Sequence, residues 1–212
     1  ITHVGSSSEA DATVASIVDG GGVASAVLAD AREPLDGAAA VAATVERHGG
    51  LDIVVNNAGV MLPRMLGDTD DDAYATTFEI NVRGALQLVR AAEPHLREGG
   101  RVIVVSATIA NDFFSPGLAL YGASKAAINA FVQGWSRDLG PRGITVNAVV
   151  PGPIDTAMNP ADSALADQLR ARTAVGRYGE VDEVAALVAF LAGPEAGFIT
   201  GTRMVIDGGL TA

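Results

Sequence analysis

The stretch LDIVVNNAG, residues 51–59, carries the two signals that decide the fold of this chain. Its first half is a short apolar run, which predicts a buried strand over Leu51–Val55. The run ends in Asn56–Gly59, where asparagine and glycine favour a tight turn. A continuous apolar strand that stops at such a turn is typical of a parallel sheet covered on both faces.

The same alternation of apolar runs and helical segments continues outward from this strand in both directions. Further strands are predicted at Ile1–Val4, Val23–Leu28, Arg101–Val105, Ile144–Val149 and Met204–Ile206. Helices are predicted at Glu9–Asp19 with Ser7 or Ser8 as N-cap, Leu35–His48, Asp70–Leu96, Tyr121–Leu139 and Val181–Ala192. The expected fold is therefore α/β: a doubly wound, Rossmann-like parallel sheet in a three-layer α/β/α arrangement.

Length and charge limit the kinds of partner that the protein can have. A chain of 212 residues predicts a single domain over 1–212. The formal net charge of −11 argues against nucleic acid as a partner, because phosphate contacts need clustered Lys and Arg. No apolar run is long enough to span a membrane and no signal peptide opens the sequence, so no membrane partner is expected and the expected location is cytoplasmic.

Metal and thiol chemistry are not indicated by the residue types. The chain has no cysteine, which rules out disulfides and thiol catalysis. Its three histidines are scattered at His3, His48 and His95 and show no metal-ligand spacing. No metal site is therefore expected.

Polar residues gather where the predicted strands end. These positions are Ser6-Ser7, Asp30, Asn57-Ala58-Gly59, Ser106-Ala107-Thr108 and Pro151-Gly152-Pro153. In parallel α/β sheets, ligands bind beyond the carboxyl ends of the strands. We therefore expect the binding site at this edge of the sheet.

Tyr121 and Lys125 are four residues apart at the start of a predicted helix, so their side chains share one helix face. A nearby ammonium favours the phenolate and lowers the pKa of a tyrosine. A phenol tuned toward neutrality can protonate a developing alkoxide or deprotonate an alcohol. The spacing alone also fits a surface tyrosine stacked on a lysine stem, so the assignment depends on the other motifs of the chain.

Several of these motifs occur in one fixed order along the chain, and the order is more specific than any single motif. The ordered set is Asn57-Ala58-Gly59, Asn81, a hydroxyl at 106–108, Tyr121-x-x-x-Lys125, Pro151-Gly152 and Asp207-Gly208-Gly209. Together these motifs closely resemble the short-chain dehydrogenase/reductase family, in the shorter form typified by the 3-oxoacyl-carrier-protein reductases. The resemblance implies hydride transfer between a nicotinamide cofactor and a small-molecule ketone or secondary alcohol. It also implies a homo-oligomer, either a tetramer or a dimer.

The resemblance implies a role for each catalytic position. Tyr121 is the expected acid/base, Lys125 lowers its pKa and binds the nicotinamide ribose, and Asn81 holds a water that links Lys125 to solvent. The hydroxyl that holds the substrate oxygen stays open between Ser106 and Thr108, because the family position falls on Ala107 or Thr108 depending on the direction of counting. Ser106 is preferred.

The resemblance also implies a set of cofactor contacts. Asn57, Ala58 and Gly59 are expected near the adenosine, Pro151, Gly152 and Ile154 near the nicotinamide, Thr156 near phosphate, Asp30 near adenine, and Ser6 and Ser7 near the ribose 2′ position. Members that prefer NAD place an acid at the end of the second strand. Here residues 2–8 contain no acid, and serine hydroxyls at a helix N-terminus suit a 2′-phosphate. NADP is therefore the expected cofactor, with NAD as the alternative.

One family feature is missing from the printed sequence. The family opens with a strand and a glycine-rich turn that cradles the pyrophosphate at a helix N-terminus. Ile1–Val4 resembles the second strand of the family, and the glycines at 20–22 follow a helix instead of a strand. The domain is therefore expected to be N-terminally incomplete, with its first βα unit missing.

Two alternatives and one further expectation concern the use of the site. A non-catalytic or cofactor-deficient relative could act as a binding module, and the same scaffold could run epimerisation or dehydration. Residues 156–178 are expected to form a lid with Met158, Leu165 and Leu169 as apolar contacts, and Phe113 and Phe114 are expected to face the same site.

Overall fold

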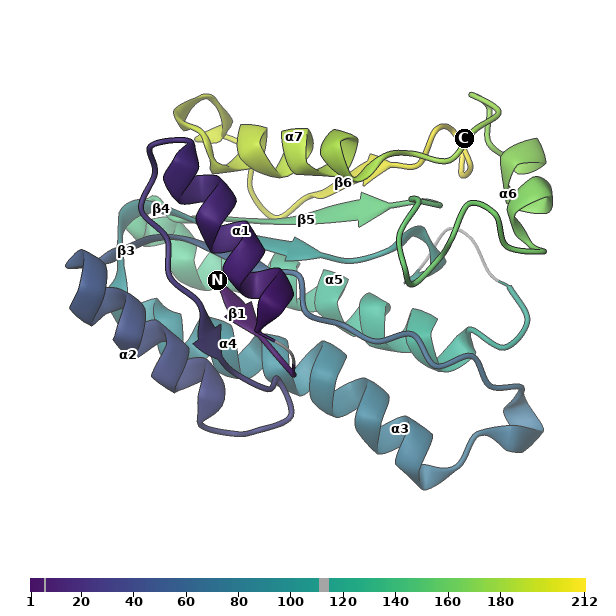
Figure 1. Cartoon of the computed structure of the whole chain (residues 1–212), viewed down its shortest axis with the longest axis horizontal. Helices are drawn as coiled ribbons and strands as arrows, with labels where there is room; N and C mark the ends of the chain where they lie inside the picture. The colour runs from purple at the N-terminus through teal and green to yellow at the C-terminus, as the bar shows by residue number, and fades with distance from the viewer. Residues whose placement is uncertain (6, 111–114) are drawn as a thin grey trace.

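The structure is a computed structural model that describes residues 1–5, 7–110 and 115–212 (Figure 1). Four parallel strands form the main sheet in the order β3-β4-β5-β6: β3 (Leu51–Asn56), β4 (Leu96–Val105), β5 (Thr145–Pro151) and β6 (Arg203–Ile206). A second parallel sheet pairs β1 (Thr2–His3) with β2 (Val27–Leu28). Every strand pair described is parallel, which confirms the predicted α/β fold.

Helices lie on both sides of the main sheet. They are α1 (Ser8–Asp19), α2 (Asp36–His48), α3 (Asp71–Phe78), α4 (Ala85–Ala92), α5 (Ala119–Leu139), α6 (Ala166–Arg172) and α7 (Val181–Ala192). Figure 1 shows α7 along one side of the sheet and α2, α4 and α5 along the other. The three predicted layers are therefore present.

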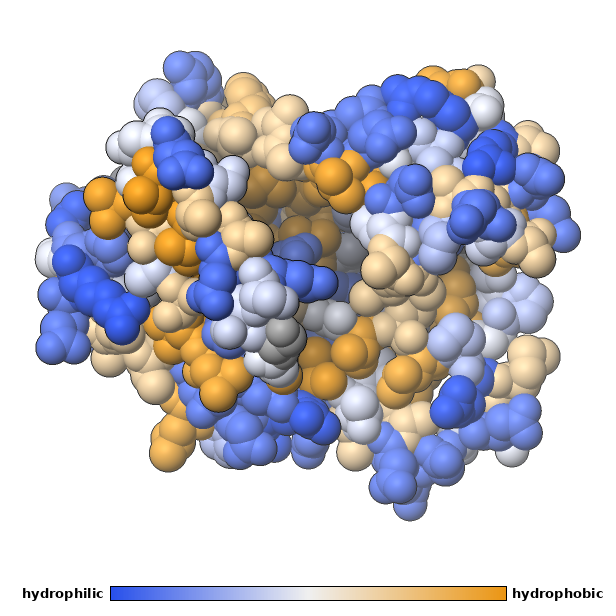
Figure 2. All heavy atoms as spheres, viewed as in Figure 1, coloured by the Kyte–Doolittle hydropathy of each residue, from blue (hydrophilic) through white to orange (hydrophobic). Residues whose placement is uncertain are grey.

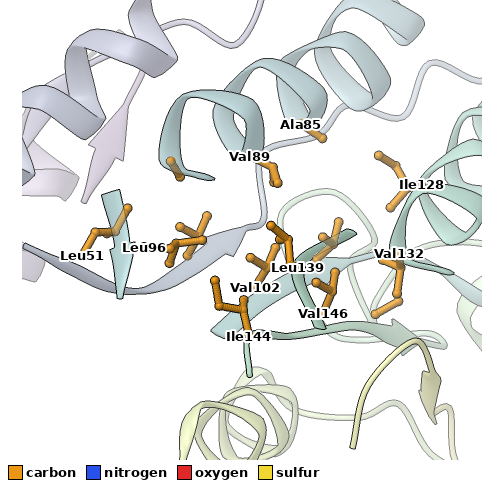
Figure 3. Close-up of a cluster of buried hydrophobic side chains, with 14 of the residues drawn as sticks. Leu51, Ala85, Val89, Leu96, Val102, Ile128, Val132, Leu139, Ile144 and Val146 are labelled. Carbon is orange, nitrogen blue, oxygen red and sulfur yellow. The ribbon is translucent and has the colours of Figure 1, made fainter. Parts of the chain in front are cut away.

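The core explains why the strands read as continuous apolar runs. Side chains alternate between the two faces of a strand. Val102 of β4 and Val146 of β5 pack with Val89 of α4 and Ile128 of α5 on one face (Figure 3). The intervening residue Ile103 packs on the other face in a cluster with α7. Both faces are thus buried at the centre of the sheet, as predicted.

The region predicted as a long helical stretch over Asp70–Leu96, broken late by Pro94, shows that late break but also divides earlier than predicted. It divides into α3, a π-helical segment at Glu79–Gly84, α4 and a 3₁₀ turn at Glu93–His95 that contains Pro94. Leu96 already belongs to β4 and pairs with Leu51. The strand therefore starts before Arg101, and Gly99, with φ of +74°, lies in an irregularity inside it.

Smaller differences occur at other element ends. The apolar run at 23–28 contributes only two residues, Val27–Leu28, to a strand. Ser7 is the N-cap residue of α1 but makes no side-chain capping bond. The segment predicted as a polar lid contains a short helix, α6. Among the described helices, none is long and apolar enough to cross a membrane.

The outer strand of the main sheet is less buried than its sequence suggests. Ile53 and Val55 are 42% and 43% exposed, so the prediction that the whole of Leu51–Val55 is buried is wrong. Within the described ranges β3 pairs only with β4, and β1 pairs only with β2. Among the described residues, β3 and β1 therefore each have one edge without a strand partner, and apolar side chains of β3 remain exposed. The absence of a first βα unit stays a prediction.

Candidate active site

The carboxyl ends of the strands open into a cavity of about 740 Å³. Its wall is mainly aliphatic, and its polar side chains are Asn57, Ser106, Thr108, Ser115, Tyr121, Thr156 and Asn159. No charged side chain is among the described lining residues. Figure 2 shows the surface hollowed near its centre, with apolar residues around the hollow. Such a cavity suits an uncharged, largely apolar ligand.

Helix α5 carries Tyr121 and Lys125 to this edge. The close packing of α5 depends on Gly122, where an added Cβ would lie 2.9 Å from the carbonyl oxygen of Ile109. Tyr121 lines the cavity, and the Lys125 Nζ lies 5.8 Å from the centre of its ring. The lysine itself is 5% exposed and its ammonium donates to the Val105 carbonyl at 2.9 Å. The two side chains therefore occupy one region, as predicted.

Burial sets the pKa of both groups. Desolvation raises the pKa of Tyr121 to about 12, because the phenolate would lose its hydration. Desolvation lowers the pKa of Lys125 to about 8, because the ammonium is the form that loses hydration there. The prediction of a lowered pKa for Tyr121 is therefore wrong for this structure: burial of the phenol raises the pKa, and Lys125 directs its ammonium at a backbone carbonyl.

Asn81 lies in the π-helical segment and is 1% exposed. Its side-chain amide accepts from the Val60 amide at 2.8 Å, donates to the Val60 carbonyl at 2.9 Å and donates to Ser124 Oγ at 3.0 Å. The amide thus ties the turn after β3 to helix α5. Gly59 of that turn lies close enough that an added Cβ would be 3.3 Å from both Asn81 Oδ1 and Lys125 Nζ. The water-holding role of Asn81 stays a prediction.

Both candidate hydroxyls after β4 lie at the cavity. Ser106 and Thr108 are 3% and 4% exposed, and both line the wall. The Ser106 hydroxyl donates to the Lys125 carbonyl at 3.3 Å, whereas Thr108 begins a 3₁₀ turn that ends at Ala110. The structure brings both residues to the site, so the choice between them stays open.

The predicted cofactor residues fall into two groups. Asn57, Pro151, Gly152, Ile154 and Thr156 line the cavity, and Ala58 and Gly59 continue the turn from Asn57. Gly152 is required at its position, because an added Cβ would lie 2.6 Å from the Cβ of Asp207. Ser7 and Asp30 are not among the lining residues, and Ser6 lies outside the described residues, as do Phe113 and Phe114.

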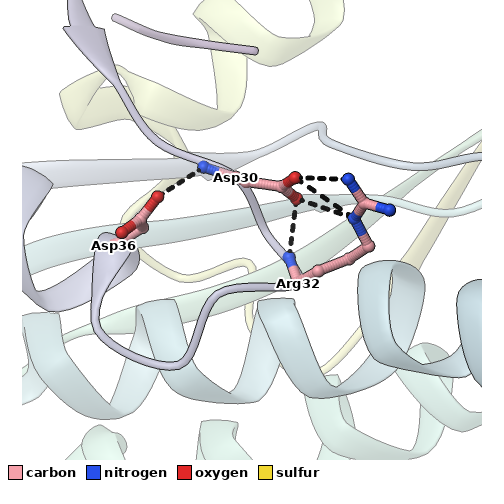
Figure 4. Close-up of polar contacts among 3 residues, drawn as sticks. All are labelled: Asp30, Arg32 and Asp36. Carbon is pink, nitrogen blue, oxygen red and sulfur yellow. Dashed lines mark hydrogen bonds and ion pairs between the residues drawn. The ribbon is translucent and has the colours of Figure 1, made fainter.

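Asp30 is engaged with its own loop (Figure 4). Its carboxylate accepts from the backbone amide of Arg32 at 2.9 Å and from the Arg32 guanidinium at 2.7–3.3 Å. Its backbone amide donates to Asp36 at 2.8 Å. The hydrogen bonds from Arg32 hold the pKa of Asp30 below its usual value. The predicted adenine contact must therefore compete with an existing ion pair.

The predicted lid does contribute to the site. Met158, Leu165 and Leu169 line the cavity, as predicted. Within the lid, the buried Tyr178 donates to Asn159 Oδ1 at 3.4 Å, and Arg177 joins the lid to Glu183 of α7 by an ion pair of 2.7 Å.

Further lining residues were missed by the sequence interpretation. They include Met61, Ile109, Ser115, Leu118, Asn159, Leu210 and the α7 residues Val181, Val184, Ala185, Val188 and Ala189. An apolar helix gives no sign in its own sequence that one of its faces borders a cavity. Only the packed arrangement reveals these residues.

A doubly wound parallel sheet with polar groups at the strand ends is the architecture of dinucleotide-binding proteins. Comparison with known proteins narrows this class. A family model described as enoyl-(acyl carrier protein) reductase matches residues 1–211. The chain therefore belongs to the short-chain dehydrogenase/reductase family.

Individual relatives agree with this family assignment. A short-chain dehydrogenase of Burkholderia cenocepacia J2315, solved in complex with NADP, is 48% identical with a TM-score of 0.97; the match covers 100% of this chain and 86% of that protein. A short-chain dehydrogenase/reductase of Serratia marcescens BCRC 10948 is 41% identical with a TM-score of 0.97 and the same coverage. A cyclic-di-GMP-binding biofilm dispersal mediator protein of Escherichia coli K12 is 40% identical over 173 residues, which cover 82% of this chain and 73% of that relative.

Proposed function

We propose that the protein is an NADP(H)-dependent oxidoreductase that transfers hydride between nicotinamide and a ketone or secondary alcohol, as a reductase of 3-oxoacyl groups or similar ketones does. The observation that carries this proposal is the meeting of three groups: Tyr121 and a buried hydroxyl line one cavity, and Lys125 lies one helical turn from Tyr121. These are the groups needed to move a proton to and from a substrate oxygen.

The cofactor would supply the hydride, and the chain would supply the proton and the orientation. With its pKa raised to about 12, Tyr121 stays protonated at neutral pH and can donate to the oxygen of a carbonyl under reduction. Ser106 or Thr108 would donate a hydrogen bond to the same oxygen. The apolar wall excludes water and favours a substrate without charge near the reacting carbon.

The residues at the site fit a nicotinamide cofactor. Gly59 lets its turn approach the Lys125 ammonium closely, because an added Cβ would lie 3.3 Å from Nζ. Lys125 would bind the ribose hydroxyls there, and the turns at 57–59 and 151–156 would hold the two ends of the cofactor. NADP is proposed over NAD because residues 2–5 and 7–8 carry no acid at the end of β1, and because a relative 48% identical is solved in complex with NADP.

The test is nicotinamide absorbance with NADPH and a panel of neutral ketones. Tyr121→Phe removes the proton donor, so turnover should fall at least about 100-fold while cofactor affinity stays near wild type. Tyr74→Phe is a matched control, because it removes the same atom from a tyrosine that is 54% exposed on α3. Ordinary turnover by Tyr121→Phe would remove this residue from the mechanism.

A binding function without turnover is the second candidate, favoured by the description of one relative as a cyclic-di-GMP-binding protein. Calorimetry with cyclic di-GMP and with NADPH separates the candidates, since a binding module should bind without oxidising NADPH in the presence of any ketone.

A homo-oligomer is proposed from the family alone. Phe131 and Trp135 of α5 would suit either a subunit seam or the core; their ring centroids lie 4.9 Å apart, and both side chains pack partly buried against the core cluster. These contacts support the core placement, and sedimentation of the purified protein measures the oligomeric state.

A further inference from the structure

The turn that follows β6, at residues 207–211, is held together by one carboxylate. Asp207 Oδ1 accepts from the Gly209 amide at 2.9 Å, and Oδ2 accepts from the Thr211 amide at 3.0 Å and from the Thr211 hydroxyl at 2.7 Å. The Leu210 amide donates to the Asp207 carbonyl at 3.3 Å. These bonds fix the backbone on both sides of Leu210, which lines the cavity.

The 207–211 turn lies against the second half of the lid. The Val175 amide donates to the Gly208 carbonyl at 3.1 Å. Gly208 and Gly209 have φ of +62° and +78°, and an added Cβ would lie 2.6 Å from Val175 Cγ2 and 2.7 Å from Ala174 Cβ, respectively. In Figure 1 the chain end marked C accordingly lies near α6 of the lid. The conformation of the turn therefore helps to set the position of the lid.

The same turn is joined to the loop after β5. The Gly152 amide donates to the carbonyl of Ile206, the residue before the turn, at 3.0 Å. Gly152 lines the cavity, and its loop is the one proposed to hold the nicotinamide end of the cofactor. The turn thus connects this loop to the lid, and Leu210 lines the cavity that both of them border.

The wall to which Leu210 contributes is aliphatic. Met158, Leu165 and Leu169 of the lid line the same cavity, and no charged side chain is among the described lining residues. In a hydrophobic pocket, one methylene more or less changes the preference between two substrates by about 10- to 200-fold. Because the turn fixes the backbone of Leu210, its side chain has little freedom to move aside for a larger group. A leucine held in this way selects its ligands by their shape.

We propose that the 207–211 turn is a specificity element of the substrate site. Leu210 contacts the apolar body of a neutral ketone or secondary alcohol. Thr211, acting through Asp207, is a positioning residue that holds Leu210 and the lid in place. This inference rests on the proposed function, because it assumes that the ketone binds in this cavity.

The first test needs no turnover and measures hydrogen exchange of the Val175 amide by NMR. Thr211→Val keeps the shape of the side chain but removes the hydroxyl that bonds Asp207, so exchange at Val175 should become about tenfold faster. Thr211→Ser keeps the hydroxyl and should exchange as wild type does. The Gly179 amide, which donates to the Pro153 carbonyl at 3.0 Å at the base of the lid, is the internal control and should be unchanged.

The second test compares kcat/KM for cyclohexanone and tert-butylcyclohexanone, two neutral ketones that differ in apolar bulk. Leu210→Ala should raise the ratio of the bulky to the small ketone about tenfold, and Leu210→Phe should lower it about as much. Leu66→Ala is the matched control, because it removes the same side chain at a position that is 92% exposed in the 3₁₀ turn Leu66–Asp68. This control should leave the ratio unchanged.

The third test separates positioning from a general loss of structure. Thr211→Val should raise KM for the bulky ketone about fivefold while kcat and the Kd of NADPH stay within about twofold of wild type. Thr211→Ser should restore KM. A fall in kcat and KM effects that serine does not rescue would overturn the positioning role of Thr211.

The possible outcomes separate this inference from the proposed function. If exchange at Val175 is equal in Thr211→Val and wild type, Thr211 does not hold the lid, and the proposed function stands. If wild type reduces both ketones but the two Leu210 variants keep its ratio, the specificity role is overturned and the proposed function again stands. If wild type reduces no ketone, the proposed function fails and the specificity role fails with it, whereas the exchange experiment still decides whether the turn holds the lid.

Discussion

Lys125 is the single lysine of the chain, and replacing it by methionine should make the protein more stable while turnover is lost. Its side chain is 5% exposed, and desolvation lowers its pKa from 10.5 to about 8. Each pKa unit corresponds to about 1.4 kcal/mol, so keeping this ammonium charged in the folded protein costs roughly 3 kcal/mol at pH 7. Methionine removes that cost but leaves the Val105 carbonyl without its donor, which costs about 1 kcal/mol. The expected net gain is therefore about 2 kcal/mol in the free energy of unfolding.

The pH dependence gives this prediction its sign. Lysine loses its proton at about 8 in the folded protein and at 10.5 in the unfolded chain. Between these values the unfolded chain binds more protons, so the stability of wild type rises with pH over this window. The advantage of Lys125→Met should be complete below pH 8 and shrink toward pH 10.5.

Urea unfolding of both proteins at pH 7 and pH 10 measures the effect. Lys125→Arg is the control, because it keeps a charge at this position at every pH of the experiment and should gain nothing. Since there is one lysine, NMR of protein labelled only in lysine follows the Lys125 titration without assignment. A pKa near 10.5, or a methionine variant no more stable than wild type at pH 7, would refute the reasoning.

Two further predictions concern the residues around Tyr121. Removing the hydroxyl that holds the substrate oxygen should lower kcat about 100-fold. Measuring kcat for Ser106→Ala and for Thr108→Ala identifies which residue supplies this hydroxyl. Equal small losses of kcat in the two variants would exclude both residues. Gly122→Ala places a methyl group 2.9 Å from a backbone oxygen of Ile109. We therefore expect the free energy of unfolding, measured by thermal unfolding, to fall by about 1–3 kcal/mol, and turnover to fall as well. Gly134→Ala, on the same helix with open space around its Cβ position, is the control and should be neutral or slightly stabilising; equal stabilities of the two variants would show that the close approach of α5 is not required.

The sequence was sufficient where one local signal decides the outcome. The apolar run at 51–55 and its polar turn predicted a parallel strand with a ligand-binding end, and Asn57 does line the cavity. The spacing of Tyr121 and Lys125 placed both on one helix face beside the hydroxyls after β4. Such features depend on helix and strand periodicity, which is readable without the fold.

The sequence was insufficient where a feature depends on burial, or on packing between segments that are distant in the sequence. The start of β4 at Leu96 depends on pairing with Leu51 across an irregularity, and this pairing is not visible in either segment alone. The raised pKa of Tyr121 follows from desolvation in the packed protein, whereas the sequence suggested only the lysine nearby. The bonding of Asp30 to Arg32 likewise depends on the conformation of the loop that joins them.

Transfer of deuterium tests the central claim most directly. The protein is incubated with a neutral ketone and NADPH in which deuterium replaces both hydrogens on the reactive carbon of the nicotinamide ring, and the product is examined by mass spectrometry. Hydride transfer predicts one deuterium on the carbinol carbon with wild type and with Tyr74→Phe, and almost none with Tyr121→Phe. An alcohol formed without deuterium, or equal labelling by Tyr121→Phe, would contradict the account.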